Sequence, residues 1–438
     1  MQKYKKEWVV SLGLLLFTAV AGLFCGFSPV AAPAGAAPVV AGDVAWMLTA
    51  TALVLLMTPG LSFFYGGMVQ RKNVISTMLQ SFIAMGVVSI LWVVVGFSLS
   101  FGDSLGGFIG SPLTYFMFRG VGGATHPALA PTIPLALFAL FQLKFAIITP
   151  ALVTGSFAER VRFMSYLIFI VLFTLLIYCP VAHWTWHPDG FLRRWGVLDF
   201  AGGTVVHMTA GFAALAGAIF MGPRKEHAPG ASHVPANIPF VLLGTGMLWF
   251  GWFGFNAGSA LAANETAVLA FMTTNTASAS AMLAWVLFDA VRGRRPSALG
   301  AAVGAVVGLV AITPAAGYVS VGQSIGIGAL ASIVSNMAVH RKARTRLDDT
   351  LDVFPCHGVG GIVGMIATGV LADKVGLIHG DPTVFTRHLL AILIVGSYSF
   401  GGSWLIYKVC DAAITLRVRP EQEEAGLDVS QHAESFTG

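Results

Sequence analysis

Two histidines lie within long apolar runs, where an ionisable side chain is costly. His207 ends the stretch Asp199-Phe-Ala-Gly-Gly-Thr-Val-Val-His, and His357 follows Asp352-Val-Phe-Pro-Cys. An ionisable residue at a bilayer centre costs roughly 2.5–3.5 kcal/mol on insertion scales, so each histidine is a functional candidate. A neutral imidazole keeps one donor and one acceptor, which suits a small hydrogen-bonding solute or a proton relay. The alternative is two separate packing histidines whose hydrogen bonds are satisfied.

Other chemistry is poorly supported. Two buried histidines can hold haem from facing helices, but neither His207 nor His357 has a further histidine three or four residues away on its own segment. The sequence contains no HExxH, P-loop or Ser/His/Asp motif, which argues against an intramembrane protease, an ATP-driven pump or another enzyme. Its four cysteines are scattered without CxxC spacing, so neither a disulfide framework nor a zinc site is indicated. We expect no enzyme activity, cofactor or metal.

Aromatic side chains gather at the predicted outer ends of two apolar runs. Trp186 closes one run, and Trp252 and Phe255 lie shortly before Ser259 in another. An aromatic face attracts a cation by about 0.5–2 kcal/mol, and a neighbouring serine hydroxyl can accept a hydrogen bond from an N–H cation. An aromatic belt at the membrane interface is the alternative explanation for the tryptophans.

Two charged residues lie close to these groups. Asp199 precedes the run that holds His207 and is suited to cap a helix there; holding backbone in place for a cation is its alternative role. Lys144 is the one charge expected near a bilayer centre. It can snorkel, pair with a carboxylate or face the bundle interior.

Composition indicates what must position these residues. Of 438 residues, 56% are hydrophobic and 10% charged, and the mean hydropathy is +0.79. A soluble domain needs more charge to cover its surface, whereas a membrane domain can face lipid with apolar side chains. The net charge of +5 comes from short basic clusters between apolar runs, so nucleic-acid binding is not indicated. We expect one large membrane domain.

The N-terminal segment fits a signal peptide. Three lysines within residues 1–7 precede the apolar run Trp8–Phe27, and Ala34-Gly-Ala36 fits a small-residue cleavage site. We expect residues 1–36 to be removed. An uncleaved first helix is the alternative.

Eleven further apolar segments follow, and most reach the ~20 residues needed to cross a bilayer. They span 44–68, 74–101, 133–157, 164–186, 200–221, 237–259, 264–290, 298–316, 320–339, 354–372 and 387–410. With the mature N-terminus outside, the inside loops and tail hold fifteen lysines and arginines and the outside loops five. This bias predicts a membrane domain over 37–413 and a cytoplasmic tail over 414–438.

Eleven segments divide into five, five and one. Inverted repeats are a common transporter plan, with the solute path at the interface between the repeats. Such a repeat places the fifth and tenth segments opposite each other, so that His207 and His357 meet. The sequence therefore predicts an all-α, polytopic membrane protein.

Several stretches together resemble the ammonium transporter family (Amt/MEP/Rh). They are Phe141-Gln-Leu-Lys-Phe145-Ala-Ile-Ile-Thr-Pro, Ala158-Glu-Arg-Val-Arg-Phe163, Asp199-Phe-Ala-Gly-Gly-Thr-Val-Val-His207, Gly251-Trp-Phe-Gly-Phe-Asn-Ala-Gly-Ser259, His357-Gly-Val-Gly-Gly and Gly426-Leu-Asp428. The resemblance implies an eleven-helix fold with an inverted five-helix repeat and one extra helix, a homotrimer and one pore per subunit. Lys144 departs from the family pattern, which has a neutral residue there.

The resemblance also implies roles for individual residues. His207 and His357 look like the twin pore histidines. The expected ammonium recruitment site is Trp186, Phe145 and Ser259 with Phe141 nearby; the gate is Phe145 and Phe255; and Asp199 and Trp252 support them. Trp186 and Ser259 favour the Amt/MEP branch.

The function implied is ammonium transport across the cell's inner (plasma) membrane. Ammonium would be recruited outside and deprotonated, and ammonia would pass the histidines while a proton follows a separate route. A passive NH3/CO2 channel of Rh type and a non-transporting ammonium sensor are the alternatives. The tail, with Gly426 and Asp428, resembles the family's regulatory C-terminus, which couples to PII-type signal proteins.

Overall fold

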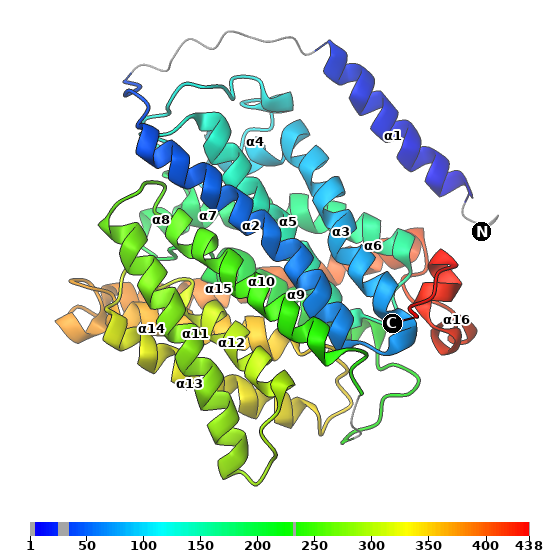
Figure 1. Ribbon diagram of the computed structural model, residues 1–438. Coiled ribbons are helices and arrows are strands. Elements are labelled where there is room, and N and C mark those ends of the chain that lie inside the picture. The colour runs from blue at the N-terminus through cyan, green and yellow to red at the C-terminus, as the bar shows by residue number, and fades with distance from the viewer. Residues whose placement is uncertain (1–4, 25–34, 231–233, 438) are drawn as a thin grey trace.

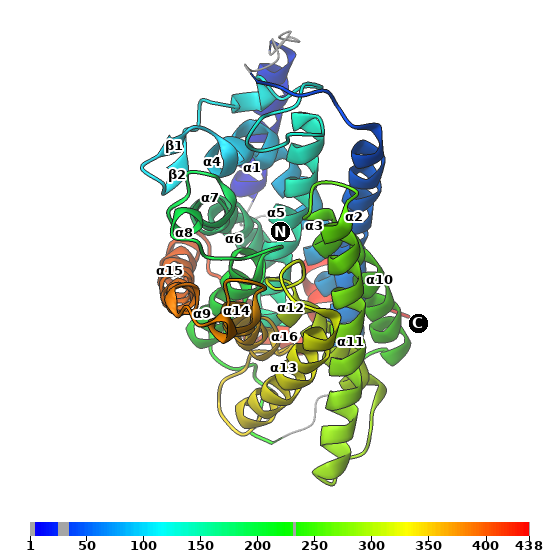
Figure 2. The same cartoon turned by 90° about the vertical axis from the view of Figure 1, so that its left-hand side faces the viewer.

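Nearly all the long apolar runs form helices, because a helix satisfies its own backbone hydrogen bonds where lipid cannot. The computed structural model describes residues 5–24, 35–230 and 234–437 (Figures 1 and 2). Its α-helices are α1 (Lys5–Leu23), α2 (Ala41–Met68), α3 (Val74–Leu91), α4 (Phe97–Phe101), α5 (Leu135–Phe157), α6 (Phe163–Phe173), α7 (Cys179–Trp186), α8 (Phe191–Arg194), α9 (Thr209–Met221), α10 (Ile238–Gly258), α11 (Glu265–Val291), α12 (Ala298–Ile312), α13 (Val321–Lys342), α14 (Gly360–Leu371), α15 (Thr383–Ala413) and α16 (Pro420–Ala425). A two-stranded antiparallel hairpin, β1 (Ser104–Leu105) and β2 (Ile109–Gly110), lies between α4 and α5.

The predicted membrane segments are confirmed as helices. Within the described residues, eleven helices are long and apolar enough to cross a membrane, counting the one at the N-terminus. The segment predicted over 298–316 is shorter, since α12 has only 15 residues. Such a helix is about 22 Å long, less than the ~30 Å hydrocarbon thickness. Most of α12 is buried by its neighbours, so it does not need to meet lipid along its length.

α1 lies at the edge of the bundle (Figure 1). No part of its apolar window is buried. Trp8, near its basic end, stacks on Phe163 with ring centroids 6.4 Å apart, and Phe163 begins α6 directly after a predicted inside loop. The predicted cleavage site falls partly outside the described residues, because they exclude Ala34.

The fifth and tenth segments cross at two glycines, as the inverted repeat predicts. A Cβ on Gly211 of α9 would lie 2.3 Å from the Cα of Gly358, so the two backbones touch. Each segment begins with a π-helical stretch, Gly203–Met208 before α9 and Phe354–Val359 before α14. His207 and His357 lie within these stretches. Because π-helical turns often mark functional sites, the local backbone supports the choice of these two histidines.

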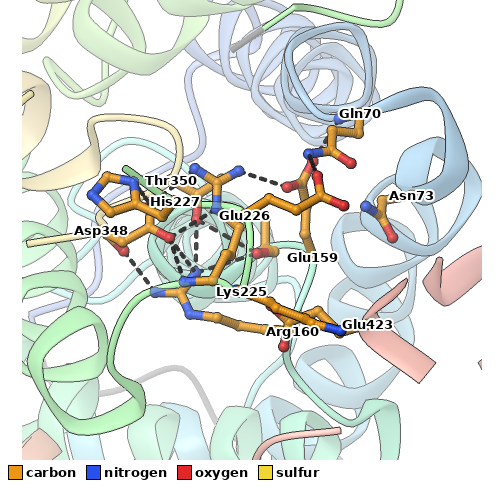
Figure 3. A network of polar contacts seen from close by, with 12 residues as sticks. Gln70, Asn73, Glu159, Arg160, Lys225, Glu226, His227, Asp348, Thr350 and Glu423 are labelled. Atoms are coloured by element: carbon orange, nitrogen blue, oxygen red, sulfur yellow. Dashed lines mark hydrogen bonds and ion pairs between the residues drawn. The ribbon is translucent and has the colours of Figure 1, made fainter. Parts of the chain in front are cut away.

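A charged network closes the predicted cytoplasmic ends of the helices (Figure 3). The Arg160 side chain is fully buried and donates to the carbonyls of Ser156 (3.0 Å), Gly222 (3.0 Å) and Asp348 (2.6 Å). Arg224 bonds both carboxylate oxygens of Asp348, at 2.8 and 2.9 Å. Burial raises the pKa of Asp348, but the bonds from Arg224 and the charge of Arg160 hold it well below its usual range. The network therefore fixes the loop that precedes the His357 helix.

The tail docks onto the start of α3. The Asp428 carboxylate accepts the backbone N–H groups of Ile75 (3.1 Å) and Ser76 (2.8 Å). Asn73, which precedes the helix, does not cap it; its side-chain oxygen accepts the Leu427 N–H at 2.8 Å instead. The tail thus supplies the N-terminal cap that α3 lacks.

Gly426 provides a test of this docking. Its φ is +92° and ψ 149°, a conformation that costs other residues about 1–3 kcal/mol. A Cβ there would also lie 2.5 Å from the Lys72 carbonyl oxygen. In Gly426→Ala we expect the tail to detach, so that trypsin cleaves after Arg417 about 5- to 150-fold faster, the equivalent of that strain. Gly401→Ala is the control, because a Cβ there meets nothing within 4 Å; equal cleavage of both variants would contradict the prediction.

Candidate functional site

A cavity of about 380 Å³ opens at the predicted outer end of the bundle. Four predicted site residues line it together: Phe145, Trp186, Asp199 and Ser259. They come from α5, α7, the loop before α9 and the end of α10. Phe141 is fully buried and packs edge-on behind Phe145, with ring centroids 4.9 Å apart. It supports the aromatic wall and does not line the cavity.

The cavity offers a cation both aromatic faces and hydrogen-bond acceptors. Trp186 meets Phe145 at 86° with centroids 5.6 Å apart, and its indole N–H is directed to the Asp199 carbonyl at 3.2 Å. The Ser259 hydroxyl donates to the Phe255 carbonyl at 2.8 Å. Because that bond uses its only hydrogen, the hydroxyl keeps its lone pairs to accept N–H donors.

Phe145 and Phe255 close the floor of the cavity. Their ring centroids are 4.2 Å apart and their planes are tilted by 31°. Trp252 packs below them and stacks on the His207 imidazole at 5.4 Å and 17°. Its indole N–H is satisfied by the Thr313 hydroxyl at 3.0 Å. A solute can pass this point only if an aromatic ring moves.

Below the gate lies a narrow pore. Its free volume is about 10 Å³, enough for about one water-sized molecule. Its lining is apolar apart from the two imidazoles: Met57, Leu61, Phe64, Ile148, Leu152, Val206, His207, Leu248, Trp252, Phe255, Val306 and His357. A bare cation is therefore strongly disfavoured in this pore.

The two histidines face each other, as the inverted repeat predicts. Their Nδ1 atoms are 3.2 Å apart, and their rings are nearly parallel with centroids 5.3 Å apart. A hydrogen bond between two Nδ1 atoms requires one ring to carry its proton on Nδ1 and the other on Nε2. The Nε2 of His207 is buried and has no partner among the described residues. The pair can therefore offer a polar edge to a small solute within the pore.

Asp199 holds the start of the His207 helix. Its Oδ1 accepts the N–H groups of Gly202 (2.8 Å) and Gly203 (2.6 Å). Its Oδ2 accepts the N–H and hydroxyl of Thr204 at 2.7 and 2.5 Å. All three N–H groups lie at the start of the helical segment, where backbone N–H groups have no acceptor within the helix. Asp199 is thus a helix cap, and the same carboxylate also borders the outer cavity.

Asp349 performs the same task for His357, and the sequence analysis missed it. Its Oδ1 accepts the Val353 N–H at 3.1 Å and its Oδ2 the Phe354 N–H at 2.7 Å. Asp349 lies eight residues before His357, just as Asp199 lies eight before His207. This repeated spacing is the signal that would have revealed it. Each histidine segment therefore begins at an aspartate cap, and the two caps lie at opposite ends of the bundle.

Burial makes Asp349 responsive to pH. Burial raises the pKa of its carboxyl to about 6, although Lys342 lowers it and Asp352 raises it further. An unfolded aspartate titrates near pH 4, so the folded protein binds this proton more tightly. Stability should therefore fall as pH rises from about 4 to about 6, by about 3 kcal/mol at most. We expect Asp349→Asn to lose this slope when its unfolding temperature in detergent is measured between pH 4 and 7. The same slope in both proteins would contradict the assignment.

Two further residues complete the comparison with the sequence. Lys144 lies half-buried on α5 and lines neither the outer cavity nor the pore, and its side chain has no ion pair or hydrogen bond within the described residues. Gln142, which the sequence analysis did not select, lines the outer cavity and has a side-chain oxygen without a partner.

Comparison with known proteins agrees with this geometry. The family model described as Ammonium Transporter Family matches residues 45–437. An ammonium transporter of Aquifex aeolicus is 46% identical over 400 residues, which cover 90% of this chain and 92% of that protein.

Solved structures show the same fold. The crystal structure of Saccharomyces cerevisiae Mep2 superposes with a TM-score of 0.82 at 32% identity, covering 88% of this chain and 89% of that one. A structure described as a sensor Amt protein also gives a TM-score of 0.82 at 32% identity, covering 89% and 98%. The fold, the site and these matches place the chain in the ammonium transporter family.

Proposed function

We propose that this chain is an ammonium transporter that divides its substrate into ammonia and a proton. The outer cavity takes up ammonium, the gate region removes a proton, and ammonia crosses the pore past His207 and His357. The observation that carries the proposal is an aromatic cavity above a narrow, largely apolar pore whose described lining includes two hydrogen-bonded imidazoles. Relatives named ammonium transporters support the choice of substrate.

The cavity suits ammonium better than potassium for a chemical reason. The two ions have the same charge and similar size, so a ring of carbonyls separates them poorly. Ammonium carries N–H donors, and Ser259 has lone pairs ready to accept one. Ammonium can also lose a proton before it enters the apolar pore, whereas potassium would have to enter as a bare charge.

The proton takes a different path from ammonia in this proposal. Each imidazole both donates and accepts, so a proton can move along the pair if the two rings exchange tautomers. Net transport then carries charge. The histidines act as a relay, and no covalent chemistry is involved.

Two other functions compete with this one. A structural relative is described as a sensor, so a non-transporting ammonium sensor is the first alternative function. A passive ammonia or carbon dioxide channel of Rh type would use the same pore without the proton. Trp186 and Ser259 together at the outer cavity favour the Amt/MEP branch, and hence a site for the charged ion.

An electrical measurement separates these functions. Purified protein in liposomes would receive an ammonium pulse and then a potassium pulse on a solid-supported membrane. We expect a current with ammonium only. Absence of current, with ammonium binding still detectable by calorimetry, would favour the sensor or the neutral-gas channel and overturn the proposal.

We further propose that the protein lies in the inner (plasma) membrane with its mature N-terminus outside and its tail in the cytoplasm. Trp8 near the basic end of α1 stacks on Phe163 at the start of α6, the end that the positive-inside rule predicts to be inside, and this contact supports the proposed orientation. The exposed faces of α1 suit a signal peptide that is later removed as residues 1–36. N-terminal sequencing of the membrane-extracted protein would test the removal.

The assembly we propose is a homotrimer with one pore per subunit. The tail, docked through Gly426 and Asp428, is proposed as the regulatory segment to which a PII-type signal protein couples at the cytoplasmic face. Its support is the set of bonds that ties it to α3. Mass measurement of the detergent-solubilised protein would test the trimer.

A further inference from the structure

The rim of the outer cavity carries an arginine that the transport mechanism does not use. Two charged side chains line this cavity, Asp199 and Arg193. Asp199 is 5% exposed, and its carboxylate already accepts four hydrogen bonds. The side chain of Arg193 is exposed, and its guanidinium has no hydrogen bond or ion pair in the part of the chain that the structure describes. The exposed charge in this lining is therefore positive, and the negative charge is buried.

The backbone holds Arg193 at this place. It belongs to α8, whose Leu192 side chain is fully buried and anchors the turn. Gly190, just before α8, packs so closely that a Cβ would lie 2.0 Å from the His183 carbonyl oxygen. Its neighbour Arg194 is different: its side chain is 64% exposed, forms an ion pair with Asp189 and does not line the cavity. Adjacent arginines thus have separate surroundings.

The field of Arg193 reaches another residue that lines the cavity. Burial raises the pKa of the Tyr318 phenol, while the charge of Arg193 lowers it and that of Asp199 raises it. Tyr318 is itself a lining residue. A cation in the cavity is bordered by these residues and therefore also feels the charge of Arg193.

We propose that Arg193 is a charge filter that sets the cavity's affinity for ammonium and excludes divalent cations. Repulsion by a fixed positive charge grows in proportion to the charge of the incoming ion. A monovalent ion loses little affinity, and aromatic faces with Ser259 compensate for it. A divalent ion such as Mg²⁺, which aromatic rings and a hydroxyl would otherwise attract, loses twice as much free energy. This inference rests on the proposal that the cavity takes up ammonium.

The size of the effect follows from the cavity itself. A sphere of about 380 Å³ is about 9 Å across. Two unit charges at that distance in water change a binding constant about twofold. Arg193→Gln should therefore lower the KM for ammonium about twofold, and Arg193→Glu about fivefold, with the maximal current unchanged. Inhibition by Mg²⁺ should strengthen about fivefold in Arg193→Gln, because the effect is squared for a divalent ion.

The test uses liposome currents in low salt and again in 1 M sodium chloride. Arg194→Gln is the matched control, since it removes the same charge one residue away, outside the cavity. We expect its KM and Mg²⁺ sensitivity to stay at wild-type values. The differences between Arg193 variants and wild type should disappear in 1 M salt, where the Debye length is about 3 Å.

Two results would overturn the inference. One is an Arg193→Glu variant with wild-type KM and Mg²⁺ sensitivity, and the other is an Arg194→Gln variant that changes both equally. Failure of the transport proposal would look different, because no variant, including wild type, would carry an ammonium current. In that case calorimetric binding of ammonium to wild type and to both Arg193 variants still decides whether Arg193 sets the affinity.

Discussion

Replacement of His207 by alanine is expected to abolish the selective ammonium current. The change removes the 3.2 Å bond to His357 and the ring that stacks on Trp252. It also widens a pore that in the wild type has room for only about one water-sized molecule. A positioned proton-transfer group typically contributes 10²–10⁴-fold, so we expect a loss of about 100-fold or more. Any remaining current should be shared by potassium, which solid-supported-membrane recordings would detect.

The second histidine provides an internal check. Two groups that act as one relay do not contribute additively, so His207→Ala, His357→Ala and the double variant should be similarly impaired. His340→Ala serves as the control, because His340 lies on α13 and lines neither the cavity nor the pore. Wild-type current and selectivity in both single variants would show that the imidazoles do not relay protons.

Replacement of Asp199 by alanine should destroy both the fold of the outer site and its transport. Four hydrogen bonds disappear, and the N–H groups of Gly202, Gly203 and Thr204 lose their buried acceptor. An unsatisfied buried donor costs about 1–3 kcal/mol, so the sum approaches the whole stability of a typical domain. We expect a large fall in the unfolding temperature measured by fluorescence-detected size exclusion.

A conservative variant separates folding from function. Asp199→Asn keeps one acceptor in place but removes the charge beside the cavity, so we expect folded protein with a raised KM for ammonium. Ser297→Ala is the matched control for loss of a helix cap. The Ser297 hydroxyl caps α12 by accepting the Gly300 N–H at 2.9 Å, and it lies at the opposite end of the bundle from the outer cavity. If Asp199→Ala were no less stable than Ser297→Ala, the cap would not have the importance assigned to it.

Much of the fold can be predicted from the sequence, because helices that face lipid must be apolar over the thickness of the bilayer. Apolar runs of membrane length, with basic residues at alternate loops, predict the helices to within a few residues. The meeting of His207 and His357 also followed, since an inverted repeat sets the fifth and tenth segments opposite each other. These inferences needed only hydropathy and order along the chain.

The remainder depends on backbone geometry that hydropathy does not encode. The π-helical stretches before α9 and α14 have the same apolar composition as ordinary helix. Asp349 was overlooked because it lies among other charges in a loop, where a cap cannot be distinguished from a solvated acid. In the sequence Arg160 resembles a loop charge that sets membrane topology, yet it is fully buried and donates to one carbonyl at the end of α5 and to two loop carbonyls.

The docking of Asp428 onto α3 also has a consequence for biosynthesis. The carboxylate that completes the start of α3 comes from a residue more than 350 positions later in the chain. A ribosome has therefore delivered more than 350 further residues before the amides of Ile75 and Ser76 receive their acceptor. A segment that is synthesised much later completes the start of an early helix, so a chain terminated before Asp428 would carry an open helix end that quality-control proteases can recognise.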